Sequence, residues 1–333
     1  MLYFLAMADN RKAAVKKLKK LVIEPREEVE AFRSRFEETL SEVFLPHHVE
    51  RVEHDYGTIR SDVLIPELSS VGKVILYIHG GSFTAGSRIS YRTFCASLSN
   101  ACSCRLVLPE FRLAPKHPFP AAIDDVQSVY TILHGELKAS RAYGSDGSIV
   151  LAADGSGASI ALALLQRLNE EDRKDISQLL LFSPWLDFSP ENEILSNKKL
   201  HDEIITGEKL HRAADIYTYA SNFRNPLVSP LCALPEKLQG FPPVYIQVGE
   251  KEILLRQAIE FRHLAEEAGI SCTVDSWPGM MFMFQMADEF LADAQLAIDA
   301  IGALIKDVPV SDLDDEAVRA ERDLILRKNN IGS

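Results

Sequence analysis

The chain has 333 residues and a formal net charge of −12, with 47% hydrophobic and 25% charged residues. This acidic balance argues against nucleic acid and anionic membrane surfaces as partners, and leaves a hydrophobic small molecule as the expected ligand. Five cysteines without C-x-x-C spacing predict reduced thiols in a cytoplasmic protein and no zinc site.

The amino-terminal segment has a brief apolar start that precedes its basic residues, which is the reverse of a signal peptide. No apolar run reaches the roughly 18–20 residues that a membrane span needs, so we predict neither a leader nor a span. Residues 11–43 repeat apolar positions with a helical period. We predict a pair of amphipathic helices within residues 1–50, which either lie on the surface or form a cap over a pocket.

Short apolar segments rich in β-branched residues follow, and they are typical of buried parallel strands. They are residues 63–67, 73–81, 104–111, 149–154, 179–185 and 242–250. Helical patterns alternate with them, which predicts an α/β fold with a doubly wound, mostly parallel sheet over residues 51–306. A polar insert at about 190–225 is expected to complete the cap, and the charged residues 307–333 are expected to form a solvated tail.

Several motifs occur in a characteristic order along this core. They are HGGSFTAGS (79–87), FRLAPKHPFPAAIDDV (111–126), LLLFSPWLDFS (179–189), NPLVSPL (225–231), VYIQVGEKEIL (244–254) and WPGMMFMF (277–284). Together they resemble the hormone-sensitive-lipase-like branch of the α/β-hydrolase fold over roughly residues 50–305. Most members of this branch are carboxylesterases and lipases, and it also includes a plant hormone receptor and a plant dehydratase.

The HGG motif directly follows an expected strand. Two glycines at this point let backbone N–H groups face a pocket, where they stabilise an oxyanion. The resemblance implies that this oxyanion hole uses the backbone of Gly80 and Gly81, with Ser156 as the third donor. A plain glycine-rich turn is the alternative, and His79 is expected to be structural.

The family's catalytic triad is altered at two places. The elbow G-D-S-A-G-G aligns with residues 153–158, which puts Gly155 where the nucleophilic serine belongs. Glu252 stands at the place of the carboxylate, either as an orienting group or as a surface residue. Phe282 stands where the histidine belongs, and no histidine follows His263. The serine-hydrolase mechanism is therefore not expected, and Ser156, one residue into a helix and without a base, is a poor replacement nucleophile.

The expected pocket floor combines the glycine of the elbow with apolar side chains. The residues expected to bind the substrate are Gly155, Phe282, Met281, Met283, Phe83 and Tyr91. The alternative for the Met and Phe residues at 280–284 is packing in the core, which we expect for about half of them.

An intact glycine loop beside an altered triad leads to the functional prediction. We expect a non-hydrolytic enzyme of natural-product biosynthesis, a lyase, isomerase or cyclase acting on a hydrophobic carbonyl compound. The expected polar helpers are Asp154, Ser156, Tyr91, Asp187 and Glu252, and no cofactor or metal is needed. One alternative is a small-molecule receptor with a lid, and another is a residual carboxylesterase that uses Ser156 or water. A homodimer is compatible with the sequence.

Overall fold

The computed structural model describes residues 2–41, 45–46, 48–141, 147–189, 191–192 and 202–306. The expected tail at 307–333 and the part of the insert at 193–201 lie outside these described residues. No helix within the described residues is long and apolar enough to cross a membrane.

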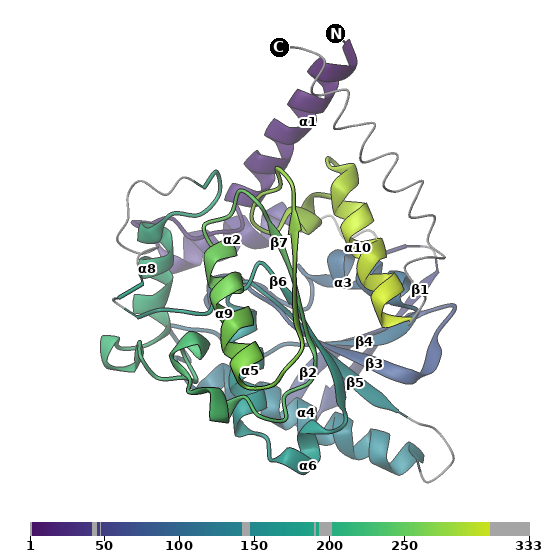
Figure 1. Cartoon of the computed structure of the whole chain (residues 1–333). Helices are drawn as coiled ribbons and strands as arrows, with labels where there is room; N and C mark the ends of the chain where they lie inside the picture. The colour runs from purple at the N-terminus through teal and green to yellow at the C-terminus, as the bar shows by residue number, and fades with distance from the viewer. Residues whose placement is uncertain are drawn as a thin grey trace.

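The described strands form one sheet with the order β1-β2-β4-β3-β5-β6-β7-β8 (Figure 1). The strands are β1 (Val49–Tyr56), β2 (Ile59–Pro66), β3 (Ser70–Ile78), β4 (Cys104–Pro109), β5 (Ser148–Asp154), β6 (Ile176–Phe182), β7 (Val244–Gly249) and β8 (Cys272–Trp277). From β4 to β8 all neighbouring strands are parallel, which confirms the predicted mostly parallel sheet.

The first two strands depart from the prediction. β1 was not predicted, because six of its eight residues are exposed and it lacks the apolar run of a buried strand. It forms a hairpin with β2, and β2 pairs with β4 in the antiparallel direction, whereas a parallel strand was expected there. The two-residue connection between Tyr56 and Ile59 forces the reversal within the hairpin, since a parallel pair needs a long crossover.

Helices cover both faces of the sheet (Figure 1). The helices are α1 (Leu2–Lys19), α2 (Val29–Thr39), α3 (Arg92–Cys102), α4 (Ala121–Arg141), α5 (Gly157–Arg167), α6 (Glu170–Arg173), α8 (Gly207–Tyr217), α9 (Leu255–Glu267) and α10 (Ala292–Ile305), with 3-10 turns η1 (Ala220–Asn222), η2 (Pro230–Cys232), η3 (Pro235–Lys237) and η4 (Phe284–Ala287). α3 and α10 pack closely, because a Cβ on Gly302 would lie only 2.4 Å from the carbonyl oxygen of Ala101.

α1 and α2 lie in the segment where a helix pair was expected, and α2 buries Phe32 and Phe36 against the body. The carboxyl ends of β3, β5 and β7 point to the same edge of the parallel sheet, so the segments that follow them are brought together there.

Candidate functional site

The turn between β5 and α5 is built around Gly155. Its φ of +46° is in the left-handed region, which glycine adopts without the cost of a Cβ. Its N–H donates to the carbonyl of Phe182 at 3.0 Å, and its own carbonyl accepts from the N–H of Trp185 at 3.0 Å. A Cβ at this position would lie 3.3 Å from Cζ of Phe282. The turn thus joins a strand to a helix through a left-handed glycine, with an aromatic ring close to the place that a side chain there would occupy.

Ser156 begins the next helix. It is the N-cap residue of α5, and its buried Oγ accepts a hydrogen bond from the N–H of Phe83 at 3.2 Å. No base holds the proton of this hydroxyl among the described residues. The nearby His79 is fully buried, which lowers its pKa to about 4, and its Nδ1 donates to the carbonyl of Gly80. Ser156 therefore lacks the activation that a nucleophilic serine needs.

Asp154, the last residue of β5, is hydrogen-bonded to the glycine loop that follows β3, which comprises residues 79–87. Its Oδ1 accepts from the hydroxyl of Tyr77 at 2.9 Å and from the N–H of Gly80 at 2.8 Å. Its Oδ2 accepts from the hydroxyl of Tyr91 at 2.9 Å. Burial raises the pKa of Asp154 to about 6, against the lowering effect of these donors. The carboxyl group is thus tied to the loop by three donors.

This arrangement changes which N–H groups of the loop face a ligand. The N–H of Gly80 was expected to be an oxyanion donor, yet it is bonded to Asp154. Gly81 and the unpredicted Ser82 line the cavity described below, and within the described residues their N–H groups have no recorded hydrogen-bond partner. The N–H of Ser156, at the amino end of α5, likewise has no acceptor in the described part of the chain. Gly81, Ser82 and Ser156 are thus the available donors.

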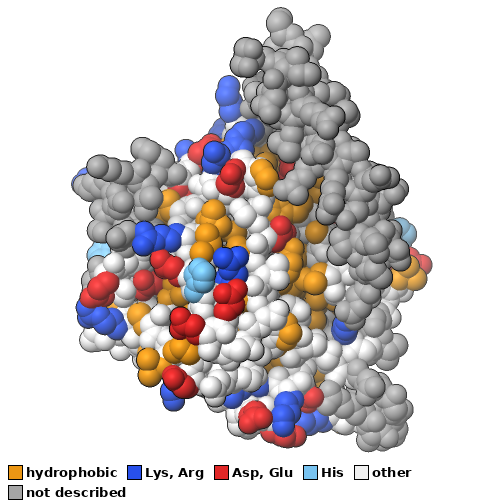
Figure 2. Space-filling model, viewed as in Figure 1, with side chains coloured by type: hydrophobic (Ala, Val, Ile, Leu, Met, Phe, Trp, Pro, Cys, Tyr) orange, Lys and Arg blue, Asp and Glu red, His pale blue; other side chains and the backbone are white. Residues whose placement is uncertain are grey.

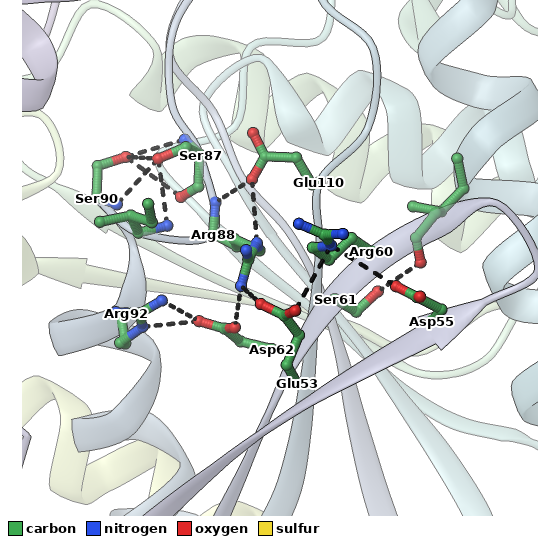
Figure 3. Close-up of polar contacts among 12 residues, drawn as sticks. Glu53, Asp55, Arg60, Ser61, Asp62, Ser87, Arg88, Ser90, Arg92 and Glu110 are labelled. Carbon is green, nitrogen blue, oxygen red and sulfur yellow. Dashed lines mark hydrogen bonds and ion pairs between the residues drawn. The ribbon is translucent and has the colours of Figure 1, made fainter.

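The carboxyl end of the loop is anchored by a buried ion cluster (Figure 3). Asp62 on β2 is fully buried and binds three arginine side chains, those of Arg51, Arg88 and Arg92. The contacts to Arg88 and Arg92 are 2.6 Å long and connect the hairpin to the start of α3. Because Tyr91 lies between these two arginines, the cluster also holds its hydroxyl in reach of Asp154.

Glu252 lies behind the site, outside the residues that line the cavity. Its Oε1 accepts from the hydroxyl of Ser183 at 2.8 Å and from the N–H of Gly249 at 2.6 Å. Its Oε2 is buried without a partner among the described residues. Burial raises the pKa of Glu252 to about 8. The hydroxyl of Ser183 also accepts from the N–H of Met283, so Glu252 supports the segment that carries Phe282.

A cavity of about 30 Å³ lies where these segments meet. Gly81, Ser82, Tyr91, Asp154, Gly155 and Ser156 supply its polar side. Leu18, Leu21 and Val22 from the end of α1 and just beyond it, with Ile205 and Leu210 from the insert, supply part of its apolar side. A void of this size holds one or two water molecules, since about 10–15 Å³ is needed for one.

Most of the predicted pocket residues reach this cavity. Gly155, Phe282, Met283 and Tyr91 line it, whereas Met281 and Phe83 do not. Met281 is fully buried in the core, and the ring of Phe83 stacks on Tyr217 with centroids 3.8 Å apart. These two side chains therefore pack the protein interior rather than the cavity.

Sequence reasoning missed the cap residues and Tyr77. The helical period of residues 11–43 indicated a helix pair and a possible cap, but it did not show which side chains of the pair line a cavity, because surface helices have the same pattern. Tyr77 is the only polar side chain in the apolar run from Val74 to Ile78, and a buried tyrosine hydroxyl requires a partner. That local irregularity was the one available signal.

Known proteins are similar to this chain in fold and in part of its sequence. A family model described as the alpha/beta hydrolase fold matches residues 75–286. The chain is similar to an acetyl-hydrolase of Streptomyces hygroscopicus, with 31% identity covering 71% of this chain and 76% of that protein. It is also similar to an esterase of Acinetobacter venetianus, with 34% identity covering 69% and 73%. An esterase structure from the bacterial hormone-sensitive lipase family superposes with a TM-score of 0.79 at 26% identity, covering 90% of this chain and 98% of that one.

These relatives contradict the predicted reaction class. They are named as an acetyl-hydrolase and esterases, so the expectation of a lyase, isomerase or cyclase was wrong. The physical reason is that backbone donors do not specify a reaction, since the same N–H groups stabilise the oxyanion of ester hydrolysis and that of an enolate. A small-molecule receptor is not better supported by these relatives.

Proposed function

This chain belongs to the α/β-hydrolase fold family, in its hormone-sensitive-lipase-like branch, and from that premise we propose that it hydrolyses small, uncharged acetyl esters at a low rate. We propose further that Gly155 and Phe282 replace the nucleophilic serine and the basic histidine of the family. The protein is then a weak carboxylesterase that works without the serine–histidine pair.

One observation carries this proposal: the glycine loop and the amino end of α5 meet at a single apolar cavity. The N–H groups of Gly81, Ser82 and Ser156 belong to residues that line it, and donors of this kind stabilise negative charge on a carbonyl oxygen. The leucine-rich remainder of the lining disfavours a charged substrate, because burial of an unpaired charge is costly. The cavity holds only one or two water molecules, so an ester needs further space there, and an acetyl group needs less of it than a longer acyl chain.

The chemistry follows from the donors that are present and the base that is absent. Hydroxide adds to the carbonyl carbon of the ester, and the charge that develops on the carbonyl oxygen is stabilised by the N–H groups. The bond between the carbonyl carbon and the alcohol oxygen then breaks to give acetic acid and the alkoxide, and the acid proton passes through water to the alkoxide, so that acetate and the alcohol are released. Enzymes that have lost a triad member retain about 10³–10⁴-fold catalysis over water from such donors and from binding.

The pH dependence of p-nitrophenyl acetate hydrolysis tests this proposal. We expect the catalysed rate to rise with hydroxide concentration and to show no plateau above pH 7, because no histidine with a pKa near 6.5 activates the nucleophile. Ser156→Ala should keep the activity, and phenylmethanesulfonyl fluoride should not inactivate the protein.

The matched control is Gly81→Ala, purified in parallel. A Cβ at this position would lie 2.2 Å from the carbonyl oxygen of Ala85, so the loop must distort and hydrolysis should fall to the uncatalysed rate. A contaminating esterase would survive in this preparation and would be inactivated by the sulfonyl fluoride. Equal turnover by the wild type and Gly81→Ala, or loss of turnover in Ser156→Ala, would contradict the proposal.

A further inference from the structure

Arg33 on α2 joins the amino-terminal cap to the glycine loop. Its Nε donates to the carbonyl of Thr84 at 2.6 Å, and its Nη2 donates to the carbonyl of Ala114 at 2.9 Å. Its Nη1 forms an ion pair with Glu30 at 2.8 Å. One planar guanidinium group therefore bridges two backbone segments that are thirty residues apart in the chain and holds both on the cap helix.

The two carbonyls belong to one small hydrogen-bonded unit. The N–H of Ala114 donates to the carbonyl of Phe83 at 3.1 Å, next to the carbonyl of Thr84 that Arg33 binds. The N–H of Thr84 donates back to the carbonyl of Gly81 at 3.1 Å. Arg33 thus closes a ring of contacts around the turn from Gly81 to Thr84, which contains two of the three proposed donors.

This turn needs external support because its backbone is strained. Ser82 has a φ of 56° and Phe83 a φ of 61°, so two consecutive residues with side chains are left-handed. Left-handed residues with a Cβ are strained and persist only where the surroundings hold them. Phe83 is held in part by its stacking on Tyr217.

We propose that Arg33 is a positioning residue, which fixes the N–H groups of Gly81 and Ser82 in the geometry that binds the ester carbonyl. This inference rests on the proposed esterase function for its chemical consequence, but not for its structural part. A guanidinium group is required because its fixed fork reaches both carbonyls at once, whereas a lysine ammonium group is a single point charge on a flexible stem. The cap helix α2 is then part of the catalytic framework.

Amide hydrogen exchange over residues 81–85 tests the structural part without any substrate. The N–H groups of Thr84 and Ala85 are bonded to the carbonyl of Gly81, so their exchange reports on the turn. We expect Arg33→Met and Arg33→Lys to raise their exchange rates by about tenfold or more, since local opening becomes easier when a tether is lost. Unchanged exchange in both variants would overturn the inference, whatever hydrolysis shows.

Hydrolysis of p-nitrophenyl acetate tests the consequence. Both variants should lower kcat by about tenfold or more and change KM by less than about threefold, because misplaced donors act on the transition state more than on the bound ester. A fall in kcat with full recovery in Arg33→Lys would overturn the bidentate role. If the wild type shows no hydrolysis while the exchange result holds, the proposed function fails and the positioning of the loop stands.

Arg35→Met is the matched control. Arg35 lies on the same helix with nearly equal exposure, 26% against 28% for the side chain of Arg33. It binds Glu27 and the carbonyls of Lys19 and Val22, and has no recorded contact with the glycine loop. It should lower stability without changing exchange at residues 81–85. Equal exchange in the Arg33 and Arg35 variants would assign the effect to loosening of the whole cap and would overturn the inference.

Discussion

At the scale of single residues, the two positions that we propose to replace the serine and the histidine, Gly155 and Phe282, lie next to each other. A Cβ on Gly155 would lie 3.3 Å from the ring of Phe282, closer than is usual for packed side chains. A serine at 155 alone would press against this ring and have no base. A histidine at 282 alone would have no hydroxyl to activate. The two positions are therefore coupled, through both packing and chemistry.

Reversal of both changes together is expected to produce an efficient esterase. Gly155→Ser combined with Phe282→His should raise kcat/KM for p-nitrophenyl acetate by about 100-fold or more, since a general base contributes 10²–10⁴-fold. Each single variant should stay within about threefold of the wild type, because residues that act as a unit are not additive. The readouts are initial rates and inactivation by phenylmethanesulfonyl fluoride, which only the double variant should show. A double variant no faster than either single variant would contradict the proposed replacement.

Glu252 makes the stability of the protein depend on pH. Its pKa is about 8 in the folded protein, against 4.5 for an exposed glutamate, because burial disfavours the charged form. Between pH 4.5 and pH 8, Glu252 therefore carries a proton in the folded state that it has lost in the unfolded state. The stability from this group is complete below pH 4.5 and is lost as the pH rises through 8.

The variant Glu252→Gln should remove this dependence. Between pH 5 and 8 the free energy of unfolding of the wild type should fall relative to that of the variant, with a slope that approaches about 1.4 kcal/mol per pH unit for one proton. Urea denaturation at several pH values measures it. Asp154, whose pKa is raised to about 6, is present in both proteins and cancels in the comparison. Parallel curves for the two proteins would show that Glu252 is ionised in the folded state.

At the scale of elements, the two amino-terminal helices contact different parts of the site. α2 is bound to the glycine loop through Arg33, whereas the end of α1 closes the cavity with Leu18. α1 is held by ion pairs at or near the surface, between Lys17 and Glu289 at 2.6 Å and between Arg11 and Glu203 at 2.5 Å. Ion pairs of this kind are weak, with about 0–1 kcal/mol each, so the burial of Ala14 and Leu18 holds α1 more firmly than these pairs do.

Leu18→Ala is expected to change both stability and chain-length preference. Removal of a fully buried leucine side chain should cost about 2–5 kcal/mol of the free energy of unfolding, measured by urea denaturation. It also enlarges the cavity, so the ratio of butyrate to acetate hydrolysis for p-nitrophenyl esters should rise. Leu133→Ala, in the buried face of α4 and away from the cavity, should lower stability and leave that ratio unchanged. The same ratio in both variants would show that α1 does not limit acyl length.

At the scale of the whole molecule, net charge should influence the choice of substrate. Acidic and basic side chains are interspersed over the face seen in Figure 2, so no single-sign patch covers the described part of that face. The sequence nevertheless carries a net charge of −12. The resulting potential opposes the approach of anions, and salt screens it with a Debye length of about 10 Å at 0.1 M.

Salt should therefore narrow the discrimination between neutral and anionic esters. The test is to measure the hydrolysis rates of phenyl acetate and 4-carboxyphenyl acetate at low salt and at 0.5 M NaCl, each divided by the uncatalysed rate of the same ester. The neutral ester should be preferred in both, because the apolar lining still excludes charge, and its advantage should shrink at high salt. A preference that does not change with salt would assign all discrimination to the cavity.

The local sequence patterns already contained the framework of the site. Buried strands, the glycine loop at Gly80 and Gly81, and the turn at Gly155 are all predictable from short stretches of sequence, because periodicity and left-handed backbone are properties of short segments. The absence of a serine at 155 and of a histidine at 282 is likewise written in the sequence. The reaction class could not be predicted from these patterns, and similarity to named esterases corrected the prediction of a non-hydrolytic enzyme.

Only the tertiary structure determines which groups at the site can contact a ligand and which are already hydrogen-bonded or buried in the core. The N–H of Gly80 is taken by Asp154, Met281 is buried in the core, and Leu18 and Leu210 close the cavity from opposite parts of the chain. Arg33 reaches the loop across about fifty residues of sequence. Such contacts depend on how distant segments pack, and packing leaves no local periodicity that could have predicted them.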